Sequence, residues 1–564
     1  MRKSILIISL TTLITAFVEG KGQGTANWQW AIGAGGLSAD YTRGIVADSA
    51  GNVYATGQYT DATLTFGSTS ITNSHNGFTD GYLVKYSSSG NCLWAKDIGG
   101  QIHDNGSCVA IDRRGNGSNV LIAGSFSSSS IVFGTTTLTN SSSAYDVFVV
   151  KYDNSGNVLW AVSGGGSGQD SPTSIATDAN GNTYVTGSFN SPSITFGSIL
   201  LTNSTANYYD VFLVKFDVNG NVVWAKNGNG MKNEASYAVV TDINGNVYFA
   251  GTYDSTSVSF GSTVLTNAGT GSSRDIFLVK YDSLGNVQWG KSIGASGNEV
   301  VNGIAVDLTG NLYLTGSFTS STLTIGSNTL LNAGTFHLPD ILIAKFNTLN
   351  GNAIWAKEVN GNMSDEGTSI GVDAVGNIYV AGYYQSDTIN LGQNILINTN
   401  SGNLQQDLFL AKYDGLGNMV WSIGKDAPAG GAVKISVAGN DLLYAGGQYS
   451  SNSINFSSST ITNHGNYDIY IAKLNGVTQG LNEILDNKGF VLFPNPVNSE
   501  LNLMSVDFQI KQVYIYNVLG ELVYSEKEKK GSRKVDISGL TNGYYLVKVL
   551  DEKGNNIVKR FVKE

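Results

Sequence analysis

The chain has 564 residues, which is more than one ordinary hydrophobic core accommodates, so we expect more than one domain. It has 70 glycines, 6 prolines and 13% charged residues. This composition favours short strands joined by tight turns and excludes a disordered or polyproline chain. The formal net charge is −10 and no Lys/Arg run occurs in the first 480 residues, so we expect no nucleic-acid partner.

The N-terminus is typical of a secretory signal peptide. Arg2 and Lys3 precede the mostly apolar segment Ile5–Val18, which is too short and wrongly flanked for a membrane span. Residues 1–20 are therefore predicted to be removed on export. No later segment approaches the roughly 18 apolar residues of a transmembrane helix, so we expect a soluble mature protein without a membrane span.

Three series of residues repeat along the chain with one period. Tryptophan recurs every 64 to 66 residues, at Trp30, Trp94, Trp160, Trp224, Trp289, Trp355 and Trp421. A Tyr-x-x-Gly strand recurs as in 52–57, 182–187 and 311–316, and seven segments begin with aspartate and end with lysine, from 80–85 to 468–473. Self-similarity at a fixed period is the signature of a repeat architecture.

Each unit contains four predicted strands. In the fifth unit they are Gly303–Asp307, Asn311–Gly316, Asp340–Phe346 and Ala353–Lys357. Four-residue turns such as 307–310 join them, with aspartate accepting a backbone N–H two residues on and glycine at the positive-φ position. Four-stranded units repeated radially form a β-propeller. We predict an all-β fold with a seven-bladed β-propeller over residues 21–478.

The two ends of the repeat array complement each other. The first strand, Trp28–Ala31, stands before the first complete unit, and the last unit ends at its third strand, Asp468–Lys473, without a tryptophan strand after it. An incomplete last blade would leave an exposed edge. We therefore predict that the N-terminal strand completes the last blade and closes the ring.

The repeats resemble the bacterial β-propeller repeat family, whose units carry Gly-Ile-Ala-Val-Asp followed by Gly-Asn-Val-Tyr-Val-Thr-Gly. The best-matching copy is 303–307 followed by 310–316, with Leu312 and Leu314 in place of the family's valines. The resemblance extends over roughly residues 25–478. It implies the fold and says little about function, because propellers include enzymes, adhesins and scaffolds.

The composition changes after residue 478, where the period stops and charged residues become more frequent. Short strands such as 501–504, 513–516 and 543–549 follow. We predict a linker at 479–487 and a small C-terminal β-sandwich at 488–564.

This C-terminal segment resembles the type A sorting domain of proteins exported by the type IX secretion system. The resemblance depends on Pro494, Asn495 and Pro496, on the segment 515–520 that ends at Gly520, and on the segment 539–545 that contains Gly543. It implies the type IX machinery as a partner and a secreted or outer-membrane surface-attached location. The alternative is an ordinary accessory sandwich.

Acidic residues recur five positions before the first apolar position of the first strand. They are Asp40, Asp104, Asp170, Glu234, Glu299 and Asp365, and the seventh unit has Pro428 there. If the first strand is innermost, six carboxylates surround one mouth of the channel and bind a cation such as calcium or the hydroxyl groups of a glycan. The alternative is that each carboxylate accepts backbone N–H bonds and organises a blade junction.

The segment between the second and third strands carries a predicted hairpin and then a stretch of variable length. It leaves the same face as the connections between units, while the tight turns occupy the other face. We therefore expect binding on this elaborated face. Tyr208 and Tyr209, in one such loop, either stack on a sugar or pack against the hairpin.

Sequence signals for catalysis are weak. The nucleophile-elbow pattern at 367–371 lies on a first strand and is interpreted as a chance match. The four histidines lack metal-ligand spacing, and 178–182 lacks the closing glutamate of a calcium loop. Cys92 and Cys108 fall on strands too far apart for a disulfide. We assign no catalytic residue and no cofactor, with calcium as the one ion that the carboxylates would suit.

The leading hypothesis is a secreted or cell-surface binding protein that engages an extracellular glycan or protein through its elaborated face. One alternative is a polysaccharide-active lyase or hydrolase, because hydrolysis needs two carboxylates about 5–10 Å apart and the acidic series offers them. The other alternative is a purely structural surface component.

Overall fold

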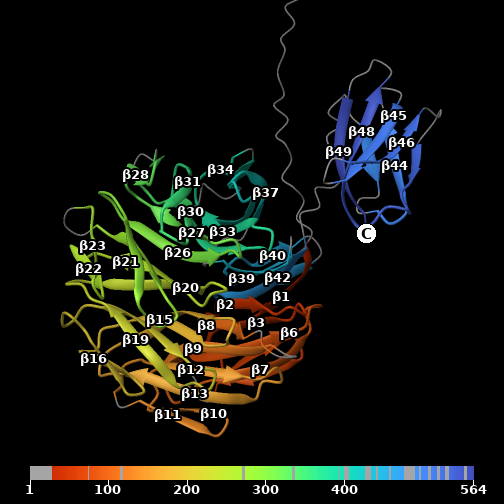
Figure 1. Cartoon of the computed structure of the whole chain (residues 1–564). Helices are drawn as coiled ribbons and strands as arrows, with labels where there is room; N and C mark the ends of the chain where they lie inside the picture. The colour runs from red at the N-terminus through yellow and green to blue at the C-terminus, as the bar shows by residue number, and fades with distance from the viewer. Residues whose placement is uncertain are drawn as a thin grey trace, which may run out of the picture. The chain divides into compact units, whose positions relative to one another are not determined.

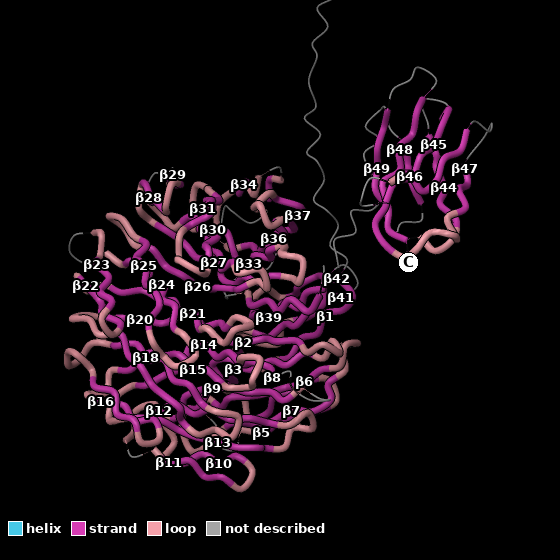
Figure 2. The backbone as a smooth tube through the Cα atoms, viewed as in Figure 1, coloured by secondary structure: helices cyan, strands magenta, loops and turns pink. Residues whose placement is uncertain are grey.

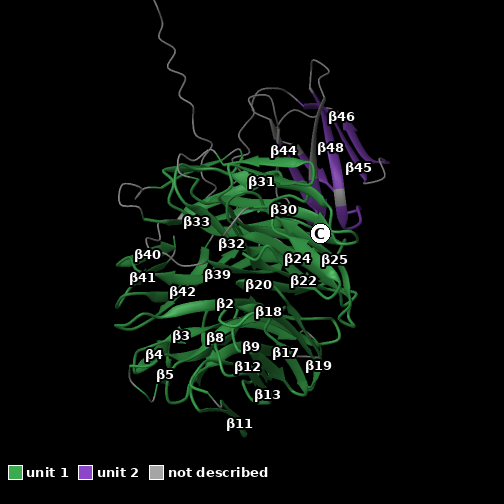
Figure 3. Ribbon diagram, turned by 90° about the vertical axis from the view of Figure 1, so that its left-hand side faces the viewer, with its two compact units in different colours: residues 1–477 green, residues 478–564 purple. Residues whose placement is uncertain are grey.

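The computed structural model describes residues 28–563 except for 74, 76, 113, 115–117, 141, 270–272, 333–336, 393, 399–404, 426–432, 440–441, 457–458, 476–489, 494–496, 506–509, 518–520, 528–532 and 552–555. The described chain consists of strands and turns, without a helix (Figure 2). It forms two compact units, Met1–Val477 and Thr478–Glu564 (Figure 3). The predicted signal peptide and the predicted linker at 479–487 lie outside the described residues.

The first unit is built from antiparallel four-strand arrays. One sheet has the order β26 (Glu299–Val306), β27 (Asn311–Phe318), β30 (Asp340–Asn347), β31 (Ala353–Val359). The same pattern occurs seven times in the described chain. The first strands, called inner strands below, are β2 (Tyr41–Ala47), β8 (Asp104–Asp112), β14 (Asp170–Thr177), β20 (Glu234–Thr241), β26, β32 (Asp365–Val372) and β38 (Lys434–Gly439).

The remaining strands of each array follow outward in chain order. The second strands are β3 (Val53–Tyr59), β9 (Asn119–Phe126), β15 (Thr183–Phe189), β21 (Val247–Tyr253), β27, β33 (Ile378–Tyr384) and β39 (Leu442–Tyr449). The third strands are β6 (Asp80–Tyr86), β12 (Asp146–Tyr152), β18 (Asp210–Phe216), β24 (Asp275–Tyr281), β30, β36 (Asp407–Tyr413) and β42 (Asp468–Asn475). The fourth strands are β7 (Cys92–Ile98), β13 (Val158–Gly165), β19 (Val222–Gly228), β25 (Val287–Ile293), β31, β37 (Met419–Lys425) and β1 (Trp28–Ala34).

The N-terminal strand completes the last array, as predicted. β1 pairs antiparallel with β42, with Trp30 opposite Lys473 (Figure 1). The next junction is also closed, because the backbone N–H of Asp40 donates to the carbonyl of Tyr467 at 2.8 Å. The first and last repeats are therefore joined by the β1–β42 ladder and by this backbone hydrogen bond between Asp40 and Tyr467.

A hairpin connects each second strand to the third strand. The hairpins are β4 (Thr63–Phe66) with β5 (Thr69–Thr72), β10 (Ser130–Phe133) with β11 (Thr136–Thr139), β16 (Ser193–Phe196) with β17 (Ile199–Thr202), β22 (Ser257–Phe260) with β23 (Thr263–Thr266), β28 (Thr322–Ile325) with β29 (Asn328–Leu331), β34 (Thr388–Asn390) with β35 (Ile395–Ile397), and β40 (Ser453–Phe456) with β41 (Ser459–Thr462). Phe66, Phe196 and Phe260 are buried beneath their hairpins. The hairpins thus extend the hydrophobic core on the elaborated face.

The tight turns have the chemistry that the sequence predicts. The Asp307 Oδ1 atom accepts the backbone N–H of Thr309 at 2.9 Å and that of Asn311 at 2.9 Å. Gly310 has a φ of +87°, which a side chain would strain. The Asp178–Asn182 segment is the same turn: Asp178 accepts N–H bonds from Asn180 and Asn182.

The repeating tryptophan and lysine link neighbouring sheets. The Trp94 indole N–H and the Lys85 ammonium both donate to the carbonyl of Asn154 in the next sheet, at 3.2 and 3.0 Å. The Lys85 Nζ atom also lies 5.1 Å from the centroid of the Tyr54 ring. Trp224 with Lys215, Trp289 with Lys280, and Trp30 with Lys473 make the same paired contact. The three sequence series therefore meet in one inter-sheet contact.

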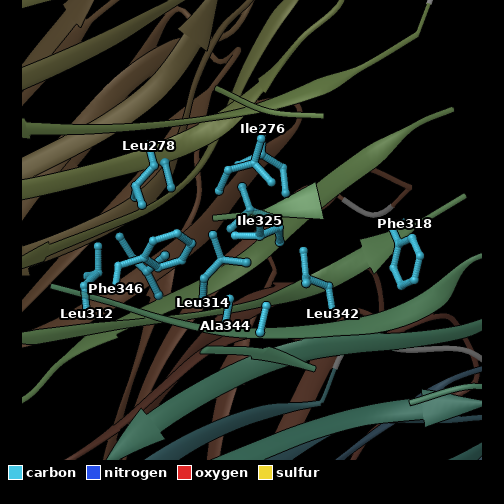
Figure 4. Close-up of a cluster of buried hydrophobic side chains, with 14 of the residues drawn as sticks. Ile276, Leu278, Leu312, Leu314, Phe318, Ile325, Leu342, Ala344 and Phe346 are labelled. Carbon is cyan, nitrogen blue, oxygen red and sulfur yellow. The ribbon is translucent and has the colours of Figure 1, made fainter. Parts of the chain in front are cut away.

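Hydrophobic clusters lie between neighbouring sheets. One contains Ile276 and Leu278 of β24 together with Leu312 and Leu314 of β27 and Phe346 of β30 (Figure 4). These side chains are essentially completely buried. Strands that are apolar on both faces are needed because each sheet packs against a neighbour on either side.

The second unit contains two sheets. One has the order β43 (Phe490–Phe493), β44 (Glu500–Ser505), β47 (Arg533–Asp536), and the other β46 (Leu522–Lys527), β45 (Ile510–Asn517), β48 (Gly543–Asp551), β49 (Asn556–Lys563). Both contribute to one buried cluster, in which Leu503 of β44 joins Val513 of β45 and Val547 of β48. Gly543 begins β48, while Pro494, Asn495, Pro496 and Gly520 lie outside the described residues.

Candidate functional site

Two cavities lie along the inner strands. The first, of about 730 Å³, is lined by the first halves of the inner strands and the last residues of the second strands. The second, of about 780 Å³, is lined by the second halves of the inner strands and the turns that follow them. All seven inner strands contribute to each cavity. The first, called the polar cavity below, therefore lies at the elaborated end.

Six inner strands contain a β-bulge at the same place, where their pairing with the second strand skips one residue. We call the skipped residues the bulge ring: Arg43, Ser107, Thr173, Tyr237, Asn302 and Thr368. All six line the polar cavity. A bulge breaks the alternation of side chains and re-aims one of them. In this protein, the six bulges place polar side chains, of a different type in nearly every blade, in the lining of one cavity.

Charged groups are concentrated in this cavity. Arg43 comes from β2, Lys434 from β38 and Glu366 from β32. Burial, and then the neighbouring Arg43, lower the pKa of Lys434. Glu366 lies opposite Tyr383 in the β32–β33 ladder and accepts its hydroxyl hydrogen bond, which together with burial raises the pKa of Tyr383.

Aliphatic side chains recur in the lining of the second cavity. Two residues beyond the bulge position, six inner strands carry a β-branched aliphatic residue, and β38 carries one at the matching place. We call this set the aliphatic ring: Ile45, Val109, Ile175, Val239, Ile304, Ile370 and Ile435. Most of its members also belong to the clusters between sheets, as Ile304 does. The inner strands therefore carry varied polar side chains at the bulge position and uniform aliphatic ones two residues further on.

The six carboxylates predicted at the channel mouth are placed elsewhere. Asp40, Asp104, Asp170, Glu234, Glu299 and Asp365 are all fully buried, and none of them lines the polar cavity. Asp104 is representative: its Oδ2 atom accepts the Gly100 N–H at 2.6 Å and the Ser128 hydroxyl at 2.8 Å. Asp170 and Asp365 accept from Ser191 and Ser386 in the same way. These contacts match the alternative in which the carboxylates organise the blade junctions.

Each of these acids faces a second buried carboxyl from the preceding sheet. The Asp104 N–H donates to the carbonyl of Thr79, the residue before Asp80, at 2.7 Å. Both oxygens of Asp80 are buried and accept no hydrogen bond from the described residues. A side chain at Gly99 would collide with the Asp80 carboxyl, so glycine is required there. The full set of junction pairs is Asp468–Asp40, Asp80–Asp104, Asp146–Asp170, Asp210–Glu234, Asp275–Glu299 and Asp340–Asp365.

Burial of two like charges at each junction favours a neutral form. Burial, followed by the charges of Asp97 and Asp104, raises the pKa of Asp80 to about 8. Burial raises the pKa of Glu234 to about 9 and that of Asp40 to about 7, with acidic neighbours adding to both. Protonation of one carboxyl removes the repulsion between the two. The pairs that contain Asp80 and Glu234 therefore retain a proton at neutral pH.

The two loop tyrosines, Tyr208 and Tyr209, do not line the polar cavity. Tyr208 is exposed, and its carbonyl accepts the Asn203 side-chain amide at 2.9 Å. Tyr209 is half-buried, and its carbonyl accepts the Glu234 N–H at 2.7 Å. Both residues shape the loop through their backbones.

Sequence reasoning missed the bulge ring and Lys434. The available signal was the variability of the first half of the first strands, where Arg43, Tyr237 and Asn302 occupy one of several positions that differ between repeats. Bulges leave no fixed sequence mark, so the cavity emerges only from the pairing register.

The remaining features of the described residues concern metal ions, membranes and thiols. There, no group of three or more His, Cys, Asp or Glu side chains is arranged to hold a metal ion. No described helix is long and apolar enough to cross a membrane. Cys92 and Cys108 are free thiols.

Family models match two parts of the chain. Residues 491–564 match the secretion system C-terminal sorting domain. Residues 164–192, 288–320 and 354–383 match the β-propeller repeat. The matched repeat segments run from fourth strands through inner strands to second strands, which are the segments that form the polar cavity.

Curated relatives are distant and longer. An uncharacterised WD repeat-containing protein of Acanthamoeba polyphaga mimivirus is 25% identical over 568 residues, covering 85% of this chain and 40% of the relative. The regulatory protein FlaEY of Caulobacter vibrioides is 33% identical over 147 residues, covering 26% of this chain and 15% of the relative. The chain thus spans less than half the length of the curated relatives that it matches.

Solved structures with a similar chain path include the WD40 domain of Neurospora crassa Pan2, with 10% identity and a TM-score of 0.38, covering 78% of this chain and 98% of that chain. Chaetomium thermophilum Sqt1 also has 10% identity and a TM-score of 0.38, covering 80% and 98%. Similarities at this level carry no information about a ligand.

Proposed function

We propose a binding function for this secreted or outer-membrane surface-attached chain, which carries β-propeller repeats and a type IX sorting domain. The protein is a closed seven-bladed propeller that holds an extracellular glycan in the polar cavity. The C-terminal unit is a β-sandwich whose role is recognition by the type IX machinery. The propeller is the part that acts once outside the cell.

The observation that carries this proposal is the bulge ring. The aliphatic positions on the same strands are alike in all seven repeats, whereas the bulge positions hold arginine, serine, threonine, tyrosine and asparagine. A structural position repeated in seven blades keeps one residue type, while a binding position varies to match an asymmetric ligand. Small-molecule sites are concave, of about 300–1,000 Å³, with a few convergent polar groups, and the polar cavity has these features.

The side chains suit a hydroxyl-rich ligand. Amides of Asn105 and Gln58 and the hydroxyl of Ser125 provide donors and acceptors. Tyr237 lines the cavity and also packs against a hydrophobic cluster, so part of its ring remains for a sugar ring to pack on. A protein segment is the other candidate occupant, but a flat protein surface would leave a cavity of this volume unfilled.

The enzymatic alternative receives less support. Glycoside hydrolysis needs a pair of carboxylates on either side of the scissile bond. Among the described residues that line the polar cavity, Glu366 is the one carboxylate. The acids of the junction pairs are buried away from this cavity, so they have no access to a glycan bound in it.

A glycan array screened with the mature full-length protein tests the proposal, first with calcium and then with a chelator. We expect a defined, saturable signal that Tyr237→Ala weakens at least about tenfold, whereas Tyr208→Ala, in an exposed loop, leaves it unchanged. Weakening by Tyr208→Ala alone would move the site to the loops. A blank array in both conditions would refute glycan binding, and a loss of signal with the chelator would add calcium to the site.

A further inference from the structure

We propose that Arg43 and Lys434 form an anion-binding element in the polar cavity, so that the ligand is an acidic saccharide. The shared chemistry is a carboxylate or sulfate group on a hydroxyl-rich sugar. This inference rests on the proposed function and names the class of glycan that the cavity selects.

The two cationic residues come from opposite ends of the repeat array. Arg43 is the bulge residue of β2 in the first repeat, and Lys434 begins β38 in the last repeat. Ring closure makes these strands neighbours, as the 2.9 Å hydrogen bond from the Ala47 N–H to the Ser436 hydroxyl shows. Both side chains line the same cavity. Two like charges are thus brought together where the first and last inner strands meet.

Neither cation is neutralised within the described chain. No salt bridge within 4.0 Å involves Arg43 or Lys434 among the described residues. The Arg43 guanidinium carbon lies 5.2 Å from the centroid of the Tyr41 ring, a cation–π contact that orients the guanidinium without neutralising it. The neighbouring Arg43 contributes to lowering the pKa of Lys434. An anion bound between the two groups would relieve this mutual repulsion.

Glu366, the carboxylate that lines the cavity, interacts with another lining residue, Tyr383. Glu366 accepts the Tyr383 hydroxyl across the β32–β33 ladder. Its negative charge lowers the cavity's attraction for anions, so the net formal charge of the three charged lining residues is one positive unit. The whole chain has a net charge of −10. An anionic ligand is therefore repelled by the net charge of the chain and attracted by the local charge at this position.

The rest of the lining requires a ligand with hydroxyl groups. The Gln406 Oε1 atom is buried and accepts no hydrogen bond from the described residues. A buried acceptor without a donor is costly unless a bound group supplies one. Gln406 lines the same cavity as Arg43 and Lys434. A sugar that carries both an anionic group and hydroxyl donors satisfies both requirements, which a simple inorganic anion does not.

Isothermal titration of the mature full-length protein tests this assignment with three probes of matched length: an oligogalacturonate, a sulfated galactan oligosaccharide, and a neutral galactan oligosaccharide. We expect at least one acidic probe to bind at least about tenfold more tightly than the neutral one. The affinity should fall as salt is raised, because the attraction is electrostatic. The two acidic probes distinguish carboxylate from sulfate.

Three variants connect the selectivity to these residues. Arg43→Gln and Lys434→Met should each weaken binding of the acidic probe about tenfold, with little change for the neutral probe. Glu366→Gln should tighten binding of the acidic probe, because it removes the opposing charge. Arg274→Gln, an exposed arginine outside the cavity, is the matched control and should change nothing. Circular dichroism and melting curves establish that each variant is folded.

The outcomes separate this inference from the proposed function. Equal binding of neutral and acidic probes, unaffected by Arg43→Gln, would overturn the anion site and leave glycan binding intact. Binding of none of the three probes to the folded protein would count against both. Poly-aspartate serves as a fourth probe. If it binds and none of the saccharides does, the anion site at Arg43 and Lys434 stands and the assignment of a saccharide ligand is overturned.

Discussion

The bulge ring and the aliphatic ring lie two residues apart on the same inner strands, yet they follow opposite rules. The aliphatic ring is uniform because its side chains pack between neighbouring sheets, as Ile45 and Ile370 do in their clusters. The bulge ring is varied because a bulge re-aims its residues toward the cavity, although Tyr237 still packs against a cluster. The repeat therefore constrains the aliphatic position and leaves the bulge position of six blades free to acquire a function.

The largest expected effect contrasts the two rings on one strand. Ile304→Asp places a carboxylate in the apolar cluster between two sheets, and should reduce the free energy of unfolding by about 3 kcal/mol or more. Asn302→Asp, two residues earlier on β26, loses one hydrogen bond from its amide to the Gly367 carbonyl and should cost about 1 kcal/mol. Denaturant unfolding followed by tryptophan fluorescence measures both. Equal costs would contradict the distinction between the rings.

The junction pairs predict that the framework is less stable in alkaline solution. Burial and acidic neighbours raise the pKa of Asp80 to about 8 and that of Asp340 to about 7, whereas an unfolded aspartate ionises near 3.8. The folded state then binds more protons than the unfolded state between about pH 4 and pH 8, so stability falls as the pH rises through this window. The apparent melting temperature should be several degrees lower at pH 9 than at pH 6.

One variant connects this pH dependence to a pair. Asp80→Asn imitates the protonated carboxyl and should raise the melting temperature at pH 9 more than at pH 6. Asp407→Asn is the control, because the following repeat has Pro428 at the sequence position where the other repeats have the acid. Identical responses of the two variants would show that carboxyl pairing is not the cause.

A smaller effect is expected at the inter-sheet tryptophans. Trp94→Phe removes the indole hydrogen bond to the Asn154 carbonyl, which is 3.2 Å long, and should cost about 1 kcal/mol beyond the loss of ring area. Trp355 has the same place in its repeat, but its indole N–H has no acceptor among the described residues. Trp355→Phe should therefore cost less, and chemical denaturation of the two variants side by side tests this.

The smallest expected effect on stability is at the bulge ring itself. Ser107→Ala removes a hydroxyl that donates to the Asn105 side chain at 2.9 Å in a solvated cavity, and should change the free energy of unfolding by no more than about 0.5 kcal/mol. Its effect should appear in glycan affinity, measured by titration. A large loss of stability without a change in affinity would assign this position to the framework.

Much of the fold was predictable from the spacing of a few residues. The tryptophan and lysine series predicted the strand order, and the unpaired first strand predicted the β1–β42 pairing. Turn chemistry at Asp307 and Gly310 followed from sequence because it involves residues that are close in the chain. The candidate site was not predictable in the same way: the acidic series led to the blade junctions, while Arg43 and Lys434 are 391 residues apart in sequence.

The sequence alone determined the repeat, the strands and the route of export, because local hydrogen bonding, apolar periodicity and a terminal motif are all written in consecutive residues. Only the tertiary structure decided which polar residues face the cavity and which carboxyls face each other. A bulge changes the direction of one side chain without changing the surrounding pattern, and ring closure brings the first and last repeats together. Ring closure followed from the unpaired first strand, but the direction of the bulge residues depends on the register between strands, which composition and spacing do not specify.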